Sequence, residues 1–249
     1  LFPYTTLFRS KAILYGIDAR CQEEMAWLTE HYGREGVLKR FGHPICSDDV
    51  AAKILWVKNH EPQVHARAYK FLTGSSYITA KLTGRYVVDQ FLAKAAFRPL
   101  YREDGTVDEA ECALYCRPDQ LCACRVVTEL AGAVTEEAAR ETGLLAGTPV
   151  IVGSGDSTSE AVSVGIVEPG EVMFQFGSSL FFYYCADHPV TDPRVHGGNY
   201  TVPGTYSVSG GTNAAGTLTR WVRDTFFADL LAAQEAGGPD AYAAMMEHL

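Results

Sequence analysis

Apolar residues at helical spacing run through the first third of the chain and predict that helices dominate it. A short apolar stretch over residues 11–20 is the exception and predicts a buried strand. The helix that follows has an apolar face made by Cys21, Met25 and Leu28. Gly33 predicts the end of this helix, because glycine commonly follows the last helical turn.

Capping residues predict further helices along the chain. Asp48 or Asp49 can cap the next helix, since a short polar side chain accepts hydrogen bonds from the first free amides. A third, shorter helix ends at Gly84. Thr135 precedes two glutamates and caps a helix that Gly143 ends. These caps and stops set the expected helix boundaries.

The pattern changes in the second half of the chain, where strands alternate with helices. Residues 149–156 predict a buried strand that runs into a glycine-rich turn, followed by a helix. Residues 171–184 predict two strands around a Gly-Ser-Ser turn. Residues 205–211 predict a strand that leads into a helix carrying Trp221. Alternating strands and helices indicate an α/β architecture, with a domain boundary expected near residues 170–180.

Composition narrows the class of protein. The 249 residues are 47% hydrophobic and 20% charged, which provides enough apolar content for a core and argues against intrinsic disorder. The formal net charge is −9 and no Lys/Arg cluster exceeds two residues, so no nucleic-acid or membrane surface is expected. The longest apolar run, residues 180–186, is far shorter than a membrane span of about 20 residues. A small molecule is therefore the expected partner.

The cysteines indicate a cytoplasmic protein with reduced thiols. Their number, seven, is odd, and in a chain of this size they form no secreted disulfide framework. Four of them lie close together and raise the alternative of a zinc site. Their spacing lacks the paired Cys-x2-Cys of structural zinc sites, so free thiols are favoured and no metal ligand is assigned. These four are Cys112, Cys116, Cys122 and Cys124.

The strongest candidate for chemistry is Asp156, in a Gly-Ser-Gly-Asp turn after a predicted strand. Ligands of open α/β sheets bind at the carboxyl ends of strands, so this carboxylate could accept a proton from a substrate hydroxyl. The structural alternative is helix capping, because Ser157 to Glu160 has the pattern of a capping box. A third alternative, a GDS-type esterase with Ser157 as nucleophile, is disfavoured because neither His188 nor His196 has an Asp three residues earlier.

Two glycine-containing turns are candidates for phosphate binding. Gly177, Ser178 and Ser179 lie between two apolar strands, where a tight turn can aim amides and hydroxyls at a phosphate. Gly211 and Gly216 lie where a strand ends and a helix begins, and a bare backbone there allows a nucleotide to approach closely. The alternatives are an ordinary hairpin turn and an ordinary helix cap, since neither turn has a Walker A or Gly-x-Gly-x-x-Gly pattern.

Taken in order, several segments resemble the FGGY family of carbohydrate kinases. ILYGIDAR, at residues 13–20, is similar to the family's Trp-x-Asp-x-Arg strand. Lys53 and Trp56 match its Lys-x-x-Trp, which precedes Leu-Thr-Gly and then an aspartate at Asp89. Residues 132–157 are similar to the family's approach to its catalytic aspartate. Several motifs in this order are far more specific than any one of them.

The resemblance runs from residue 11 to about residue 226. It implies an actin/hexokinase-like (ribonuclease H-like) fold of the α/β class, truncated at both ends. It also implies ATP-dependent phosphorylation of a sugar hydroxyl with Mg²⁺ at the phosphates, and it leaves open a homodimer of the full-length protein. Asp156 matches the catalytic base, and Asp156 and Ser157 are the expected sugar-binding residues. The expected nucleotide-binding residues are Gly177, Ser178 and Gly216, which match the family's pocket, together with Ser179 and Gly211.

The same resemblance predicts the domain organisation. Residues 1–10 are expected to be a non-native lead-in, 11–175 most of the N-terminal sugar-binding domain, and 176–249 the start of the C-terminal nucleotide-binding domain. The family's Asp-x-Gly-Thr phosphate loop would precede residue 11, so this chain alone is expected to be inactive. Residues 188–211 look most like xylulokinase-type members and favour a ketopentose such as xylulose. The alternative function is a non-catalytic sugar-binding or interaction relative of the kinase fold.

Overall fold

The computed structural model divides into two compact units, Leu1–Ser159 and Glu160–Leu249, which we call unit 1 and unit 2. Half of the strand expected over residues 11–20, namely residues 11 and 14–17, lies outside the described residues. The boundary expected at residue 175, between the domains of the whole protein, stays a prediction. The residues that the structure describes are 12–13, 18–190, 192, 194–212 and 214–247.

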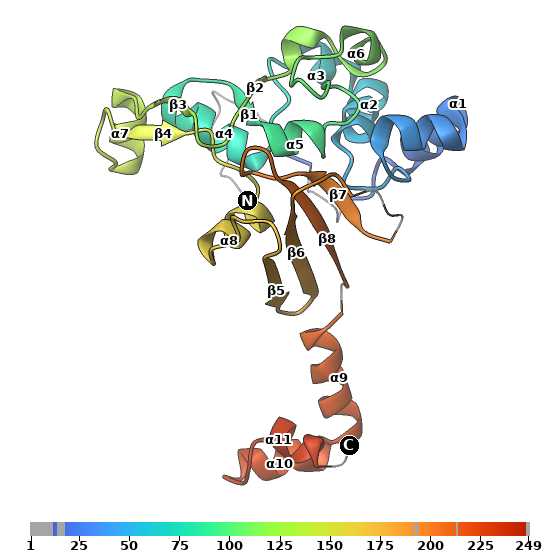
Figure 1. Ribbon diagram of the computed structural model, residues 1–249, viewed down its shortest axis with the longest axis vertical. Helices are drawn as coiled ribbons and strands as arrows, with labels where there is room; N and C mark the ends of the chain where they lie inside the picture. Colours follow the sequence, from blue (N-terminus) through green and yellow to red (C-terminus); the bar gives the residue numbers. More distant parts are fainter. Residues whose placement is uncertain (1–11, 14–17, 191, 193, 213, 248–249) are drawn as a thin grey trace. The chain divides into compact units, whose positions relative to one another are not determined.

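Unit 1 combines helices with two small two-stranded sheets (Figure 1). Helix α8 (Asp156–Ser163) begins in this unit and continues into unit 2. The other elements of unit 1, in chain order, are α1 (Gln22–Phe41), α2 (Val50–His60), α3 (Pro62–Arg67), α4 (Gly74–Thr83), β1 (Val87–Asp89), α5 (Gln90–Lys94), α6 (Glu109–Tyr115), the 3₁₀ helix η1 (Pro118–Gln120), β2 (Ala123–Arg125), β3 (Leu130–Ala133), α7 (Glu136–Thr142) and β4 (Pro149–Ile151).

The helix boundaries expected from caps and stops are confirmed at α4 and α7. Gly84 and Gly143 follow these helices with φ values of 71° and 78°, the left-handed region that glycine adopts without strain. Thr135 caps α7 by accepting a hydrogen bond from the Ala138 amide. Asp49 occupies the N-cap position of α2, but its side chain makes no hydrogen bond to a helix amide. The cap position at α2 is therefore confirmed, and its capping role is not.

Gly33 ends the first of the two helical segments that α1 joins across a kink, so the predicted helix end is confirmed. Its φ of 65° and ψ of 165° lie outside the helical region and produce a kink. The helix resumes and ends at Gly42, which has a φ of 80°. Val37 and Phe41 explain the continuation, because they lie four residues apart on one face and are both buried.

The main hydrophobic core of unit 1 lies among α1, α2, α6 and the segment around α5. It contains apolar side chains from segments that are distant in sequence, so α1 and α2 pack against residues more than forty positions later. The largest fully buried apolar side chains of this core are Leu28, Phe41, Ile54, Phe97, Leu100 and Tyr115.

The two small sheets of unit 1 place the turn that leads to Asp156. Strands β1 and β2 are parallel, and β3 and β4 are antiparallel. The prediction of a buried strand at β4 is wrong, since Pro149 and Ile151 are exposed. The physical reason is that, within the part of the chain that the structure describes, β4 pairs with β3 alone. Val152, just after the strand, is buried.

Unit 2 contains one antiparallel sheet of four strands, in the order β5-β6-β8-β7 (Figure 1). The two strands expected around the Gly-Ser-Ser turn are confirmed as the β5–β6 hairpin, and the strand and helix expected after residue 205 are β8 and α9. The elements of this unit are β5 (Val172–Phe176), β6 (Leu180–Ala186), β7 (His196–Asn199), β8 (Tyr206–Thr212), α9 (Gly216–Phe226), α10 (Ala228–Glu235) and α11 (Ala241–Met246).

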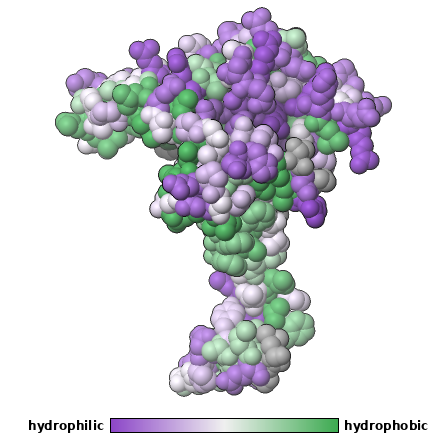
Figure 2. Space-filling view, in the orientation of Figure 1, coloured by the Kyte–Doolittle hydropathy of each residue, from purple (hydrophilic) through white to green (hydrophobic). Residues whose placement is uncertain are grey.

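The core of unit 2 is small and lies against one face of its sheet. Tyr183 and Tyr200 pack at 5.2 Å between ring centroids, and the Tyr200 hydroxyl donates to the Ile166 carbonyl at 2.6 Å. The other face of β5 exposes Phe174 and Phe176. Figure 2 shows apolar and hydrophilic residues mixed along α9, where Trp221 is 54% exposed. None of the described helices has the length and apolar character required to span a membrane.

Candidate functional site

The turn that carries Asp156 is fixed by backbone hydrogen bonds to a neighbouring segment of unit 1. The Val152 amide donates to the Glu129 carbonyl at 2.9 Å. The Gly153 amide donates to the Val127 carbonyl at 3.1 Å. Gly153 has a φ of 74°, which an L side chain rarely adopts. The chain therefore leaves β4 along a defined path before α8 begins.

A buried carboxylate holds the middle of this turn. Asp89 is the last residue of β1 and the N-cap of α5. Its Oδ1 accepts hydrogen bonds from the Leu92 amide at 3.0 Å and from the Ser154 hydroxyl at 3.3 Å. Burial raises the pKa of Asp89, against the lowering effect of these two hydrogen bonds. Asp89 matches a family motif in the sequence but had no predicted role, and in the structure it joins α5 to the Asp156 turn.

Asp156 is the first residue of α8, and its side chain is exposed. Its Oδ1 accepts a hydrogen bond from the Ser157 amide at 2.8 Å, which orients the carboxylate. Ser157 is half-buried and lies inside α8, so the pattern from Ser157 to Glu160 does not form a capping box at this helix start. The carboxylate is thus accessible to a substrate and held by its own helix.

The two other motif segments of unit 1 form a polar cluster. Both carboxylate oxygens of Asp18 accept hydrogen bonds from the Arg20 guanidinium, at distances between 2.6 and 2.9 Å. The hydrogen bond from Arg20 lowers the pKa of Asp18, and the charge of the buried Lys53 acts in the same direction. The guanidinium carbon of Arg20 lies 4.9 Å from the centroid of the Trp56 ring. The Asp-x-Arg and Lys-x-x-Trp motifs therefore meet in space.

Unit 2 has a hollow of about 490 Å³ at the start of α9. Gly177 and Ser178, from the β5–β6 turn, line it together with Gly216. Ser179 lies in the same turn but not among the lining residues, and Gly211 lies within β8. The structure thus brings three of the five predicted nucleotide-binding residues to one hollow and leaves the other two outside it.

Backbone hydrogen bonds join the turn to α9 at this hollow. The Gly216 amide donates to the Gly177 carbonyl at 3.0 Å, and the Ala215 amide donates to the Ser178 carbonyl at 2.9 Å. A Cβ atom on Gly216 would lie 2.5 Å from the Gly177 carbonyl oxygen, closer than real Cβ contacts allow. Glycine is therefore required at the start of α9 for this approach.

Four further residues line the hollow, and none of them is among the five predicted nucleotide-binding residues. They bring hydroxyl groups, a guanidinium and an aromatic ring to a place where phosphates or a base could bind. The spacing after Gly216 could have identified three of them at the start of the predicted helix. Tyr242 comes from α11 and has no local signal. These residues are Thr217, Thr219, Arg220 and Tyr242.

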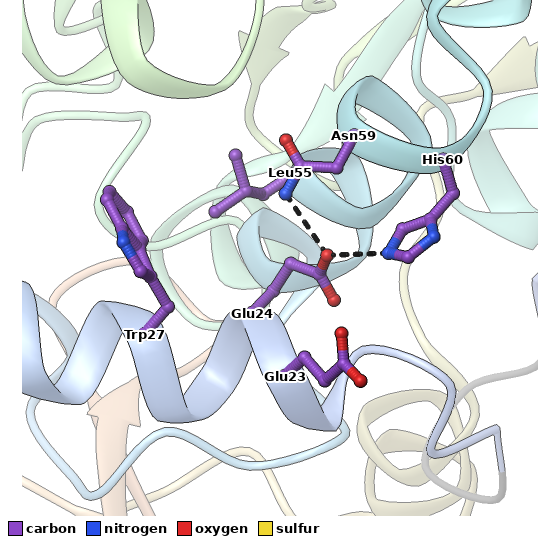
Figure 3. A pocket seen from close by; sticks show the side chains of 6 residues that line it. All are labelled: Glu23, Glu24, Trp27, Leu55, Asn59 and His60. Carbon is purple, nitrogen blue, oxygen red and sulfur yellow. Dashed lines mark hydrogen bonds and ion pairs between the residues drawn. The ribbon is translucent and has the colours of Figure 1, made fainter.

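A second hollow, of about 280 Å³, lies between α1 and α2 in unit 1 (Figure 3). Glu24 is 3% exposed, and its Oε1 lies 3.1 Å from Asn59 Nδ2 and 3.0 Å from His60 Nε2. The other oxygen, Oε2, is buried without a hydrogen-bond partner. Glu23 and Trp27 complete the walls, and no predicted site residue lines this hollow. Glu24 therefore acts as a buried polar link between two helices.

Comparison with known families decides where the chain belongs. Residues 10–163 match the N-terminal domain of the FGGY family of carbohydrate kinases. The chain belongs to this family. The match includes Asp89 and Asp156, and solved members with a similar structure confirm the expected actin/hexokinase-like fold.

Individual FGGY proteins resemble the chain over most of its length. Autoinducer-2 kinase of Klebsiella pneumoniae is 29% identical over 238 residues, which are 93% of this chain and 44% of that protein. Gluconokinase of Bacillus licheniformis is 28% identical over 86% of this chain and 42% of that protein. The solved xylulose kinase of Rhodospirillum rubrum is 31% identical with a TM-score of 0.79, covering 89% of this chain and 46% of that one. The chain thus spans less than half the length of these relatives.

Proposed function

We propose that the whole protein transfers a phosphoryl group from ATP to a hydroxyl group of a sugar or sugar-like substrate. The observation that carries this proposal is the exposed Asp156 carboxylate, on a turn held by the buried Asp89, within the FGGY match. Phosphoryl transfer depends mainly on positioning and charge stabilisation, so a fixed and accessible carboxylate is what the protein has to supply.

Asp156 is the general base of this proposal. Its carboxylate accepts the proton of the substrate hydroxyl as that oxygen attacks the phosphoryl group. The hydrogen bond from the Ser157 amide holds one carboxylate oxygen and so limits rotation of the side chain. Ser157, the next residue of α8, is the second proposed sugar-binding residue.

The residues of the chain fit ATP and Mg²⁺ by the chemistry of their donors. Mg²⁺ takes oxygen ligands and is commonly held by substrate phosphates together with one or two carboxylates. In unit 2, the Ser178 and Thr217 hydroxyls and the Arg220 guanidinium line one hollow, and such donors suit phosphate oxygens. When bound, MgATP supplies the phosphoryl group and neutralises the charge that develops during transfer.

The substrate within the carbohydrate class is a narrower proposal. The relatives are named for three different compounds, as autoinducer-2 kinase, gluconokinase and xylulose kinase. We take a ketopentose such as xylulose as the first compound to test, because residues 188–211 look most like xylulokinase-type members. The odd number of cysteines, seven, favours reduced thiols and a cytoplasmic location for this reaction.

The test is turnover by the full-length protein, measured as ADP release with a panel of pentuloses, hexuloses, aldonates and polyols. We expect one compound class to stimulate ADP release, and Asp156→Asn to lower that turnover by about 100- to 10,000-fold. Asp156 is exposed, so this variant should keep its fold. Glu160→Gln is the matched control, because it removes another exposed carboxylate from the same helix. Equal turnover of Asp156→Asn and Glu160→Gln would refute the assigned base.

A further inference from the structure

The loop between α1 and α2 brings together three side chains that ligate metals. His43, Cys46 and Asp49 each offer one ligand atom, and these three atoms lie within 4.8 Å of one another. Over the described part of the chain, no other set of three His, Cys, Asp or Glu side chains is gathered as closely. Their spacing is His-x2-Cys-x2-Asp, which the sequence analysis did not single out.

The orientation of the His43 ring is that of a metal-ligating histidine. Its Nδ1 lies 2.9 Å from the Pro44 carbonyl oxygen. A carbonyl oxygen can only accept, so Nδ1 carries the proton, and the lone pair of the neutral ring is on Nε2. Histidines that bind metals are fixed in this way, by donating the second ring N–H to a carbonyl or carboxylate. Nε2 faces Asp49 Oδ1 at 3.6 Å.

Asp49 is turned toward the same point. It occupies the N-cap position of α2, yet its side chain does not bond to the helix amides as a cap would. Its Oδ2 accepts a hydrogen bond from the Cys46 amide at 2.8 Å, and the residue is 1% exposed. His43 Nε2 and Asp49 Oδ1 therefore face each other, within reach of one metal ion.

We propose that His43, Cys46 and Asp49 bind one Zn²⁺ ion. Zinc binds thiolate sulfur, imidazole nitrogen and carboxylate oxygen at about 2.0–2.3 Å in tetrahedral geometry, and a site with three protein ligands takes a water as the fourth. Atoms bound to zinc at these bond lengths lie about 3.3–3.8 Å from one another. The distances between the three ligand atoms therefore have to shorten by about 1.5 Å or less when the ion binds. The Cys46 thiol loses its proton to solvent when its sulfur binds the ion.

The ion would connect the end of α1 to the start of α2. Gly42 ends α1, and Val50 begins α2, so His43 and Asp49 lie at the two ends of the loop. A ligand that binds the folded state alone raises the free energy of unfolding, so zinc should raise the melting temperature. This role is independent of the proposed phosphoryl transfer, because no residue of the Asp156 turn takes part in it.

Cobalt(II) provides a direct spectroscopic test on the full chain, prepared without a histidine tag and freed of metal by a chelator. We expect one equivalent of Co²⁺ to give a thiolate-to-metal charge-transfer band in the near ultraviolet and the strong visible bands of a tetrahedral site. Added Zn²⁺ should abolish both. The absence of a thiolate band, with the protein folded by circular dichroism, overturns the proposal.

Variants assign the band to this loop. Cys46→Ser and His43→Gln should each remove the charge-transfer band or weaken Zn²⁺ binding by about tenfold or more. These partly exposed positions are preferred to the buried Asp49, whose replacement risks unfolding the chain. Cys124→Ser is the matched control, since Cys124 is also a half-buried free thiol of unit 1, and this variant should keep the full band. A band that persists in Cys46→Ser or disappears in Cys124→Ser overturns the assignment.

Discussion

The Asp156 turn of unit 1 and the Gly177–Ser178 turn of unit 2 are held in place by different kinds of contact. In unit 1, a buried side chain does this, because Asp89 accepts the Ser154 hydroxyl across a long stretch of sequence. In unit 2, two backbone segments touch directly, with the Gly216 amide on the Gly177 carbonyl. The first arrangement depends on one carboxylate and its charge, and the second on the absence of a side chain.

This difference predicts different weaknesses for the two turns. A turn held by a buried carboxylate responds to the protonation of that group and to its replacement by an isosteric amide. A turn held by close backbone approach is insensitive to pH, and even one added methyl group disturbs it. Substitutions at Gly216 and Asp89 can therefore separate the two modes.

The largest effect is expected for Gly216→Ala. The added Cβ would lie 2.5 Å from a backbone oxygen, so either the turn or α9 has to move. We expect a loss of about 1–3 kcal/mol in the free energy of unfolding, measured by urea denaturation of the full-length protein. Weaker ATP binding should accompany it, because the same atoms line the hollow.

Gly74→Ala is the matched control for this substitution. Gly74 is also the first residue of a helix, α4, and a Cβ there meets nothing within 4 Å. The control should be neutral or stabilising by up to about 1 kcal/mol, since alanine reduces the entropy of the unfolded chain. Similar stability of the two variants would show that the close approach at Gly216 is not required.

A smaller effect is expected for Asp89→Ala. The substitution removes the N-cap of α5 and the acceptor for Ser154, which should cost about 0.5–2 kcal/mol in the free energy of unfolding. Asp108→Ala is the control, because Asp108 caps α6 but does not reach the Asp156 turn. Both variants should lose stability, but turnover per folded molecule should fall only in Asp89→Ala. Equal turnover per folded molecule in Asp89→Ala and Asp108→Ala would show that Asp89 does not position the Asp156 turn for catalysis.

Local signals in the sequence were sufficient for much of this fold. Thr135 and Gly143 identified both ends of α7, because caps and stops act within one helical turn. The Gly-Ser-Ser turn between apolar runs identified the β5–β6 hairpin for the same reason. Gly33 identified the end of the first helical segment of α1, but the second segment was not predicted, since it depends on the tertiary burial of Val37 and Phe41.

The parts of the sites that the sequence did not reveal depend on contacts between distant segments. Asp89 and Ser154 are 65 residues apart, and no local pattern reports their hydrogen bond. Tyr242 reaches the hollow from a separate helix. The exposure of β4 depends on how many strands pair with it, which its own apolar sequence does not encode. Asp156 was identified through the resemblance to the FGGY family, because that resemblance rests on several segments that are distant in the sequence.

The smallest effect, and the sharpest distinction between the two turns, is the pH dependence of Asp89→Asn. The amide can still accept from the Leu92 amide and the Ser154 hydroxyl, but it does not titrate. Burial raises the pKa of Asp89 above its ordinary value of 3.8, so the folded state binds more protons than the unfolded state just above that pH. This carboxylate therefore lowers the free energy of unfolding as pH rises, by about 1.4 kcal/mol for each tenfold difference between its acid dissociation constants in the unfolded and folded states.

The asparagine variant should consequently gain stability relative to the parent protein as pH rises above 3.8. Asp108→Asn should show the opposite sign, because hydrogen bonds from the Glu111 amide and Arg102 lower the pKa of Asp108. Because its pKa is lowered, Asp108 raises the free energy of unfolding of the parent protein as pH rises. Asp108→Asn lacks this contribution, so it should lose stability relative to the parent protein. Urea denaturation over an acidic pH series measures both differences. If the stability differences of Asp89→Asn and Asp108→Asn change with pH in the same direction, the charged form of Asp89 does not destabilise the folded protein. The Asp156 turn would then not depend on the charge of a buried carboxylate.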